Sequence, residues 1–226
     1  MSKKLFVTGT GTDIGKTYIS GLLVKKMREN QHSVAYYKAA MSGNVRDEEG
    51  TLIPGDAMEV KELSGISQAI ESMCPYVFEM AVSPHLAARL ENCPIDLQKV
   101  KQQFYQLSEQ YDYLLMEGSG GITCPITYDN GKVYLWELVK ELDLPSVIVA
   151  DAGLGTINDV VLTCFFMKQH GLKVKGLIFN HVHPGDVMEE DNIKMCREIT
   201  GCPVLALVSE GDSDLNIDEE SLETLF

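Results

Sequence analysis

The chain is short of positive charge for its size. Its 226 residues include 19 Lys and Arg against 33 Asp and Glu, which leaves a formal net charge of −14. Proteins whose main partner is the nucleic-acid backbone or an anionic membrane present a positive surface to it. We therefore expect no nucleic acid and no membrane among the partners of this chain. A single loop can still bind phosphate through backbone N–H groups and one lysine.

Long hydrophobic runs and paired cysteines are also missing. No apolar stretch approaches the ~18 residues that a membrane-spanning helix needs. The first apolar run, 5–7, is cut short by glycines, which argues against a signal peptide. The six cysteines are scattered, with no Cys-x-x-Cys pair. We expect free, buried thiols and a cytoplasmic location.

Internal repeats and linkers rich in Pro, Gly or Ser are absent as well, so we predict one domain over residues 1–226. Only the end of the chain differs in composition: residues 210–220 carry six acidic residues and no basic one. We predict that this acidic C-terminal segment, residues 210–226, is a solvated and partly mobile tail.

The chain does contain a regular alternation of short apolar runs and helical patterns. In most of the runs both the odd and the even positions are apolar, which is typical of strands buried on both faces of a parallel sheet. This alternation predicts an α/β fold with a doubly wound, mostly parallel sheet and helices on both faces. The dipeptide Asn130-Gly131, inside the run 126–134, predicts a hairpin. The predicted strands are 4–8, 33–37, 113–116, 146–150, 174–179 and 204–208, and the predicted helices are 15–30, 86–91, 96–110, 135–142 and 157–170.

A glycine-rich loop, residues 8–17, follows the first predicted strand and ends in Gly15-Lys16-Thr17. Glycines let several backbone N–H groups converge on phosphate oxygens, and the start of the next helix adds partial positive charge. Lys16 can reach the β- and γ-phosphates, and the Thr17 hydroxyl can ligate Mg²⁺. Thr10 occupies the usual first glycine position. The place between strand and helix nevertheless favours a nucleotide-phosphate site over a simple glycine turn.

Charged and polar side chains follow other strands too. Lys38 comes at the end of the second strand with Ser42 four residues later, and Glu117 ends the third strand before a Gly-Ser-Gly-Gly run. With Asp56 and Thr17, Glu117 makes an all-oxygen set of the kind that Mg²⁺ prefers. The alternatives are an ordinary surface lysine for Lys38 and a helix N-cap for Asp56. Ligands bind at the carboxyl ends of parallel strands, so we expect these residues to lie close together.

The fourth and fifth strands end in further polar residues. A second glycine loop, 151–158, is either an anion site or a turn that caps the next helix. Asn180 ends the fifth strand, and its amide could recognise an adenine edge. His181 and His183 alternate in an extended segment, and we do not expect them to share a metal.

These residues resemble those of dethiobiotin synthetases. The resemblance runs from residue 5 to about residue 208, and the Lys38–Ser42 pair and the Glu117-Gly-x-Gly-Gly run are its more discriminating parts. The unusual spacing of the phosphate loop is itself typical of that family. The resemblance rests on 7–17, Tyr37-Lys38 with Ser42-Gly43, Asp56-Ala57, Ser83-Pro84-His85, 117–121, 153–158 and Asn180.

The resemblance implies a P-loop NTPase fold and an ATP-dependent ligase that uses 7,8-diaminononanoate, CO₂ and MgATP. One amine captures CO₂ as a carbamate, whose oxygen attacks the γ-phosphate. The second amine then closes the ureido ring on the carbamic-phosphoric anhydride and releases phosphate, giving dethiobiotin and ADP. It also implies a homodimer in which the loop 153–158 reaches the substrate carboxylate in the neighbouring subunit.

The family's functional residues carry over onto matching positions. The resemblance implies that Lys16 and Lys38 neutralise phosphate and carbamate oxygens, and that Ser42 touches the substrate. It assigns Mg²⁺ to Thr17, Asp56 and Glu117. The segment 208–212 departs from the family's usual Ile-Pro, which leaves the contacts to the base open. The implied nucleotide contacts are Asp13, Ile14, Gly15, Lys16, Thr17, Tyr18, Asp56, Glu117, Gly118, Ser119, Gly120 and Asn180.

Two other readings compete with this one. A regulatory ATPase switch of the septum-site or partition type (ParA/MinD-like) usually carries an extra lysine early in the phosphate loop, where this chain has Gly9-Thr10-Gly11. A membrane-binding switch would also need a basic amphipathic C-terminal helix, whereas this end is acidic. A ring-closing synthetase of the cobyrinic acid type usually brings a glutaminase domain, for which the chain is too short.

Overall fold

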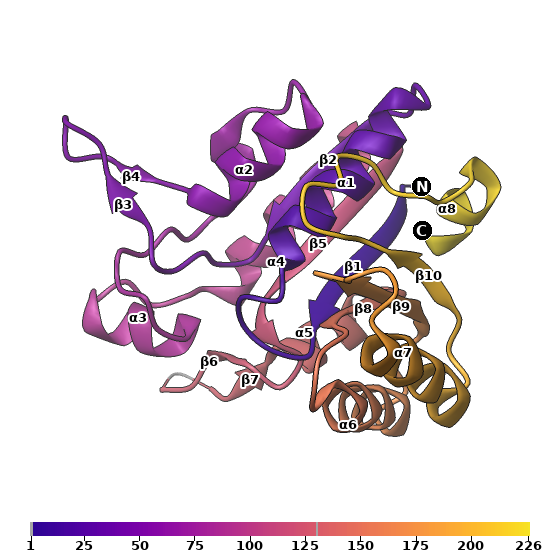
Figure 1. Ribbon diagram of the computed structural model, residues 1–226. Helices are drawn as coiled ribbons and strands as arrows, with labels where there is room; N and C mark the ends of the chain where they lie inside the picture. The colour runs from indigo at the N-terminus through magenta and orange to yellow at the C-terminus, as the bar shows by residue number, and fades with distance from the viewer. Residues whose placement is uncertain (1, 130) are drawn as a thin grey trace.

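The computed structural model describes residues 2–129 and 131–226. Its main sheet has six parallel strands in the order β10-β9-β8-β1-β5-β2, and helices cover both faces (Figure 1). The doubly wound α/β fold predicted from the sequence is confirmed, and all six predicted strands lie in this sheet. Their bounds are β1 Lys3–Gly9, β2 Val34–Lys38, β5 Tyr113–Gly121, β8 Ser146–Asp151, β9 Val174–Asn180 and β10 Val204–Leu207.

The helices include all five that the sequence predicts and three that it misses, α2, α7 and α8. The missed α7 turns Glu189, Asn192, Cys196 and Thr200 inward, so polar residues occupy most of the positions at which a core-facing helix usually carries apolar ones. The start of α7 could have been recognised from Asp186, because Asp is a favoured N-cap residue. In the structure its side chain accepts hydrogen bonds from two backbone N–H groups. The helices are α1 Lys16–Glu29, α2 Gly55–Ser64, η1 Ile70–Ser72, α3 Pro84–Leu90, α4 Leu97–Gln110, α5 Leu135–Glu141, α6 Thr156–Gln169, α7 Val187–Thr200 and α8 Glu219–Leu225.

Two short hairpins lie outside the main sheet. The first pairs β3 (Val45–Arg46) with β4 (Leu52–Ile53), and the second pairs β6 (Pro125–Thr127) with β7 (Val133–Tyr134). The second is the hairpin predicted from the sequence, although Asn130 of its turn lies outside the described residues.

The core divides into two hydrophobic clusters, one on each face of the sheet. Strand β1 shows why, because successive side chains of a strand point to opposite faces. Leu5 and Val7 belong to the cluster under α1, α2 and α8, whereas Phe6 belongs to the cluster under α4, α5 and α6. The sheet is therefore buried on both sides, as the runs of apolar residues on both parities predict.

The acidic C-terminal segment is docked, so the prediction of a solvated, partly mobile tail is wrong. The segment crosses α1 and ends as α8 beside the N-terminal strand (Figure 1). Leu215 and Leu222 are buried in the core cluster under α1. Lys25 donates a hydrogen bond to the carbonyl of Ser213 at 2.7 Å, and Lys26 pairs with Asp214 at 2.9 Å. Apolar residues spaced among the acidic ones hold the segment, and cations of α1 offset part of its charge.

The cysteine prediction holds in part. All six thiols are free, and four of them are buried, but Cys93 is exposed and Cys124 is half-buried. Among the described residues, no helix is both long enough and apolar enough to cross a membrane.

Candidate nucleotide and substrate site

The glycine-rich loop connects β1 to α1 and leaves the start of that helix open. Gly15 is the N-cap residue, and no described side chain caps the helix. The first N–H groups of α1 therefore remain available to an anion. Gly15 has φ +81°, and a Cβ there would lie 2.0 Å from Nδ2 of Asn180, so both backbone and space require glycine. Lys16 donates a hydrogen bond to the Gly11 carbonyl at 2.6 Å and thereby closes the loop.

A buried ionic network lies beside this loop, and the register of the sheet assembles it. Lys38 on β2 is paired with Glu117 on β5. The Lys38 Nζ lies 2.6 Å from Glu117 Oε1 and 2.6 Å from Asp56 Oδ2. Glu117 also accepts hydrogen bonds from the Thr17 hydroxyl at 2.9 Å and from the Tyr36 hydroxyl at 2.9 Å. The Glu117 side chain thus links its own strand β5 to β2 and to α1.

The electrostatics of the two lysines differ. Burial opposes the charge of Lys38, but the carboxylates of Glu117 and Asp56 outweigh burial and hold the pKa of Lys38 above its usual value. Burial lowers the pKa of Lys16, and repulsion from Lys38 lowers it further. Lys38 is therefore held in its charged form by ion pairs with two carboxylates. Lys16 has no ion pair among the described residues, so a bound anion would stabilise its charged form more than that of Lys38.

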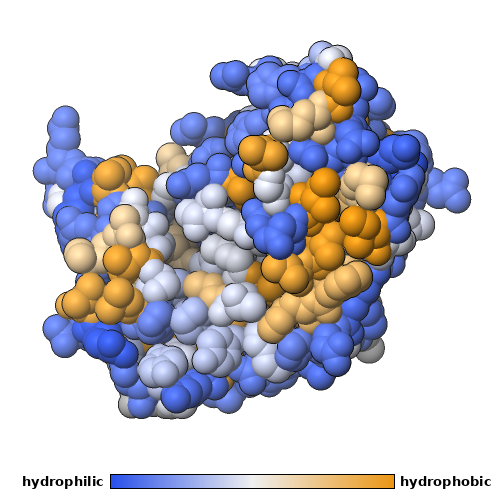
Figure 2. Space-filling view, turned by 60° about the horizontal axis from the view of Figure 1, so that its bottom comes forward, coloured by the Kyte–Doolittle hydropathy of each residue, from blue (hydrophilic) through white to orange (hydrophobic). Residues whose placement is uncertain are grey.

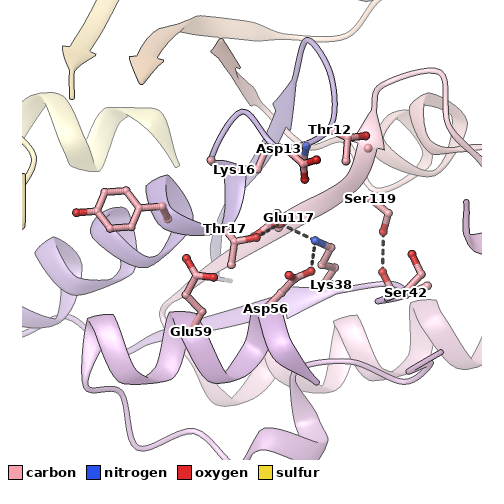
Figure 3. Close-up of a pocket in the computed structure, with 14 residues that line it drawn as sticks. Thr12, Asp13, Lys16, Thr17, Lys38, Ser42, Asp56, Glu59, Glu117 and Ser119 are labelled. Carbon is pink, nitrogen blue, oxygen red and sulfur yellow. Dashed lines mark hydrogen bonds and ion pairs between the residues drawn. The ribbon is translucent and has the colours of Figure 1, made fainter. Parts of the chain in front are cut away.

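The loop and the network line one pocket of about 430 Å³ (Figure 3). Figure 3 shows Thr17, Lys38, Asp56 and Glu117 meeting at its floor, and Ser42 and Ser119 along one side. Ser119 is fixed by a hydrogen bond to the Ala40 carbonyl at 2.6 Å. Eleven residues predicted from the sequence line this pocket: Asp13, Gly15, Lys16, Thr17, Tyr18, Lys38, Ser42, Asp56, Glu117, Ser119 and Gly120. Asp56 lies in the first turn of α2, two residues beyond the N-cap position, which is held by Pro54.

Three other predicted residues do not line this pocket. Ile14 is buried against Gly9. Gly118 is packed so closely that a Cβ there would lie 2.8 Å from Phe6 and 2.9 Å from Leu135. Asn180 is buried behind the loop, and its amide donates to the Ile14 carbonyl at 3.2 Å. These residues support the loop from inside the protein.

Three lining residues are not among the contacts named from the sequence: Thr12, which lies within the predicted phosphate loop, Ala40 and Glu59. Glu59 is the most informative of them because it brings a third carboxylate to the pocket. Burial raises the pKa of Glu59, and the charges of Asp56 and Glu117 raise it further. The sequence feature that could have identified Glu59 is its i, i+3 spacing from Asp56, which places both side chains on one face of a helix.

The second glycine loop lies between β8 and α6 and does not line this pocket. Its Leu154 side chain is 92% exposed. The two histidines after β9 face separate carboxylates: His181 lies 2.7 Å from Asp151, and His183 lies 2.8 Å from Glu189. Each imidazole thus has its own partner.

Comparison with solved structures places this fold. The chain resembles the septum site-determining protein MinD of Pyrococcus horikoshii, solved with Mg-ADP, with a TM-score of 0.53 and 15% identity, covering 100% of this chain and 87% of that one. It resembles a ParA family ATPase of Chlorobium tepidum with a TM-score of 0.54 and 13% identity, covering 99% and 89%. At these identities the likeness shows the fold alone, and the ParA/MinD-like alternative has no further support.

The parallel sheet and the phosphate loop at its carboxyl edge define the class: this is a P-loop NTPase fold with a nucleotide-type pocket. The model of a family described as AAA domain matches residues 3–213. The chain is 44% identical over 227 aligned residues to the ATP-dependent dethiobiotin synthetase BioD of Brachyspira hyodysenteriae, covering 100% of both chains. It is 45% identical over 201 residues to that of Clostridium perfringens, covering 89% and 88%. The chain belongs to the ATP-dependent dethiobiotin synthetase family.

Proposed function

We propose that this protein makes dethiobiotin from 7,8-diaminononanoate, CO₂ and ATP. The observation that carries the proposal is the position of Lys38. Its ammonium group lies in the same pocket as the phosphate loop, held 2.6 Å from each of two carboxylates. An ammonium group has three N–H donors, so one remains for a carbamate oxygen next to the γ-phosphate. The chain's identity to relatives named for this activity supports the same assignment.

The residues present fit a bound Mg²⁺. Thr17, Asp56 and Glu117 offer a hydroxyl and two carboxylates, and the pocket already stabilises the positive charge of Lys38 between these carboxylates. We assign Mg²⁺ to these three residues. When bound, the cation would offset the negative charge of the β- and γ-phosphates.

In the proposed reaction the protein mainly positions reactants and neutralises charge. One substrate amine adds to CO₂ and loses a proton to form a carbamate. Lys38 and Lys16 then hold the carbamate oxygens and the γ-phosphate together, so that the carbamate attacks phosphorus and ADP leaves. The second amine attacks the carbonyl of the carbamic-phosphoric anhydride and expels phosphate, which closes the ring. Ser42, at the side of the pocket, is placed to contact the diamine.

The open N-terminus of α1 and the loop residues from Asp13 to Tyr18 provide the proposed contacts to the nucleotide phosphates. Asn180 remains a proposed contact to adenine. In the free protein its Nδ2 supports the loop through the Ile14 carbonyl, so this assignment requires the remaining polar atoms of the amide to face the base.

A test of the activity measures release of ADP and phosphate with ATP, bicarbonate and the diamine, leaving out each in turn. We expect release only with all three, together with a product of the mass of dethiobiotin. A monoamine analogue provides the matched control, because it can form a carbamate but cannot close the ring. ATP turnover at an equal rate without the diamine would falsify the synthetase assignment.

We further propose that the protein is a homodimer. Exposed apolar side chains gather over α6 and α7, and Figure 2 shows this hydrophobic area on the surface. Leu154 of the second glycine loop adjoins the start of α6, which supports a role for the loop 153–158 at a neighbouring subunit's substrate. Phe165→Glu should convert the dimer to monomers in sedimentation experiments, whereas an unchanged mass would contradict this interface. The exposed residues concerned are Leu154, Leu162, Phe165, Val187, Met188 and Ile199.

A further inference from the structure

A second group of potential ligands lies at the opposite edge of the sheet from the nucleotide pocket. His32 is in the turn between α1 and β2, and Glu219 and Glu223 are one helical turn apart on α8. One ligand atom of each side chain lies within 4.8 Å of the others. The group exists only because the C-terminal segment is docked, since 187 or more residues separate His32 from the two glutamates.

The spacing of these atoms is that of a metal site. The Nε2 of His32 is 3.2 Å from Glu223 Oε1 and 3.8 Å from Glu219 Oε1. A tetrahedral cation with bonds of about 2.0–2.1 Å holds its ligand atoms about 3.3–3.4 Å apart. The two distances at His32 lie within a few tenths of an ångström of this spacing. The two glutamate oxygens lie within 4.8 Å of each other and would approach by at most about 1.4 Å to bind the same cation.

The His32 Nε2 atom gives a second, independent indication. It is shielded from solvent and has no hydrogen-bond partner among the described residues, because its contacts with the two carboxylates lack hydrogen-bond geometry. The ring itself is held against Tyr113, with centroids 4.8 Å apart. The His32 ring is 22% exposed, but its Nε2 atom is shielded and lies 3.2 Å from a Glu223 oxygen without a hydrogen bond; a cation bound between them would satisfy this nitrogen.

The charges around the group leave room for a dication. Two carboxylates and a neutral imidazole sum to a formal charge of −2. Among the described residues, Lys3 forms an ion pair with the group, its Nζ lying 3.4 Å from the other oxygen of Glu223. Lys175 donates a hydrogen bond to the backbone carbonyl of the neighbouring Thr224. Imidazole with carboxylates favours Zn²⁺, Co²⁺ or Ni²⁺ over Mg²⁺ or Ca²⁺.

We propose that His32, Glu219 and Glu223 bind a divalent transition-metal cation of the Zn²⁺ class, which fastens α8 to the N-terminal edge of the sheet. The protein supplies three ligands from two elements, and water completes the coordination. Because the site requires the docked segment, the cation binds the folded chain and stabilises it. This proposal does not depend on the reaction in the nucleotide pocket.

The test uses full-length protein freed of metal with a chelator, and Zn²⁺ as the probe. Calorimetric titration should show one cation per chain. At one hundred times the dissociation constant, Zn²⁺ should raise the midpoint of thermal unfolding by roughly 5–10 °C. His32→Gln and Glu223→Gln should each weaken binding at least tenfold. Glu219→Gln alters a more exposed residue and covers the case in which His32→Gln fails to fold.

Matched variants separate this site from other ligands of the chain. Glu220→Gln changes a carboxylate of α8 outside the group, and His183→Gln changes a histidine with only one carboxylate partner. Both should bind Zn²⁺ as the unmodified protein does. With Co²⁺ as probe, the near-ultraviolet spectrum should lack a thiolate charge-transfer band. The proposal is overturned by absence of stoichiometric binding, by unchanged affinity in the His32 and glutamate variants, or by a thiolate band.

Discussion

Replacing Lys38 by methionine tests the network at the centre of the site. The change removes the ammonium group and keeps an apolar stem of similar length. Asp56 and the fully buried Glu117 would then face each other without the cation that lies 2.6 Å from both. Removing one partner from a buried ion pair costs about 3–5 kcal/mol. In a chain of this length 1 kcal/mol corresponds to about 2–4 °C, so the midpoint of thermal unfolding should fall by roughly 6–20 °C.

A second measurement on the same variant separates charge from packing. If the lost stability reflects two unpaired carboxylates, a divalent cation should compensate for the missing ammonium group. Mg²⁺ should therefore raise the unfolding midpoint of Lys38→Met more than that of the unmodified protein. Lys173→Met serves as the control, because Lys173 and Asp143 form an exposed pair that contributes little.

The same variant should separate ring closure from nucleotide binding. We expect the rate of dethiobiotin formation to fall by about 10²–10³-fold, the usual effect of removing a charge-stabilising group. ATP affinity measured by calorimetry should change only a few-fold, since Lys16 and the start of α1 remain. Loss of ATP binding would assign Lys38 to the phosphate site instead, and an activity loss below tenfold would refute its role at the carbamate.

Three further predictions follow from the described contacts. Gly15→Ala should abolish tight ATP binding in the same titration, because the φ of +81° and the 2.0 Å approach of Asn180 leave no place for a Cβ; wild-type affinity would contradict this view of the loop. Leu222→Ala should destabilise the protein by about 2–5 kcal/mol in denaturant unfolding, whereas a solvated tail would give no change. The pKa of Lys38 is raised above its usual 10.5, so its ion pairs stabilise the fold fully below pH 10.5 and less as the pH rises through the higher folded-state value. Between pH 9 and about pH 12, unfolding midpoints should therefore fall more steeply for the unmodified protein than for Lys38→Met, and parallel curves would argue against the pairing.

Much of the fold was predictable because its signals are local. The strands are apolar on both parities, and the phosphate loop is marked by glycines between a strand and a helix. Helix α7 was missed because its inward face carries mostly polar residues. The inward-facing residues of α7 are Glu189, Asn192, Cys196 and Thr200, which pack through hydrogen bonds and a thiol.

The site residues were predictable in kind, but their contacts were not. Rules for parallel sheets place Lys38 and Glu117 at one edge. That Lys38 lies between Glu117 and Asp56, and that Glu59 joins them, depends on the register of β2 with β5 and on the position of α2. Neither is encoded in a local pattern, since 79 residues separate Lys38 from Glu117.

By itself, the sequence determined the class of fold, the phosphate loop and the chemistry available at the strand ends. Only the tertiary structure decided what the acidic end of the chain does. Locally, its charge favours solvation, but Leu215 and Leu222 find a hydrophobic cluster and Lys25 and Lys26 supply nearby cations. Burial of apolar surface and distant opposite charges outweigh a local excess of negative charge, and both become available only when segments far apart in the chain are brought together.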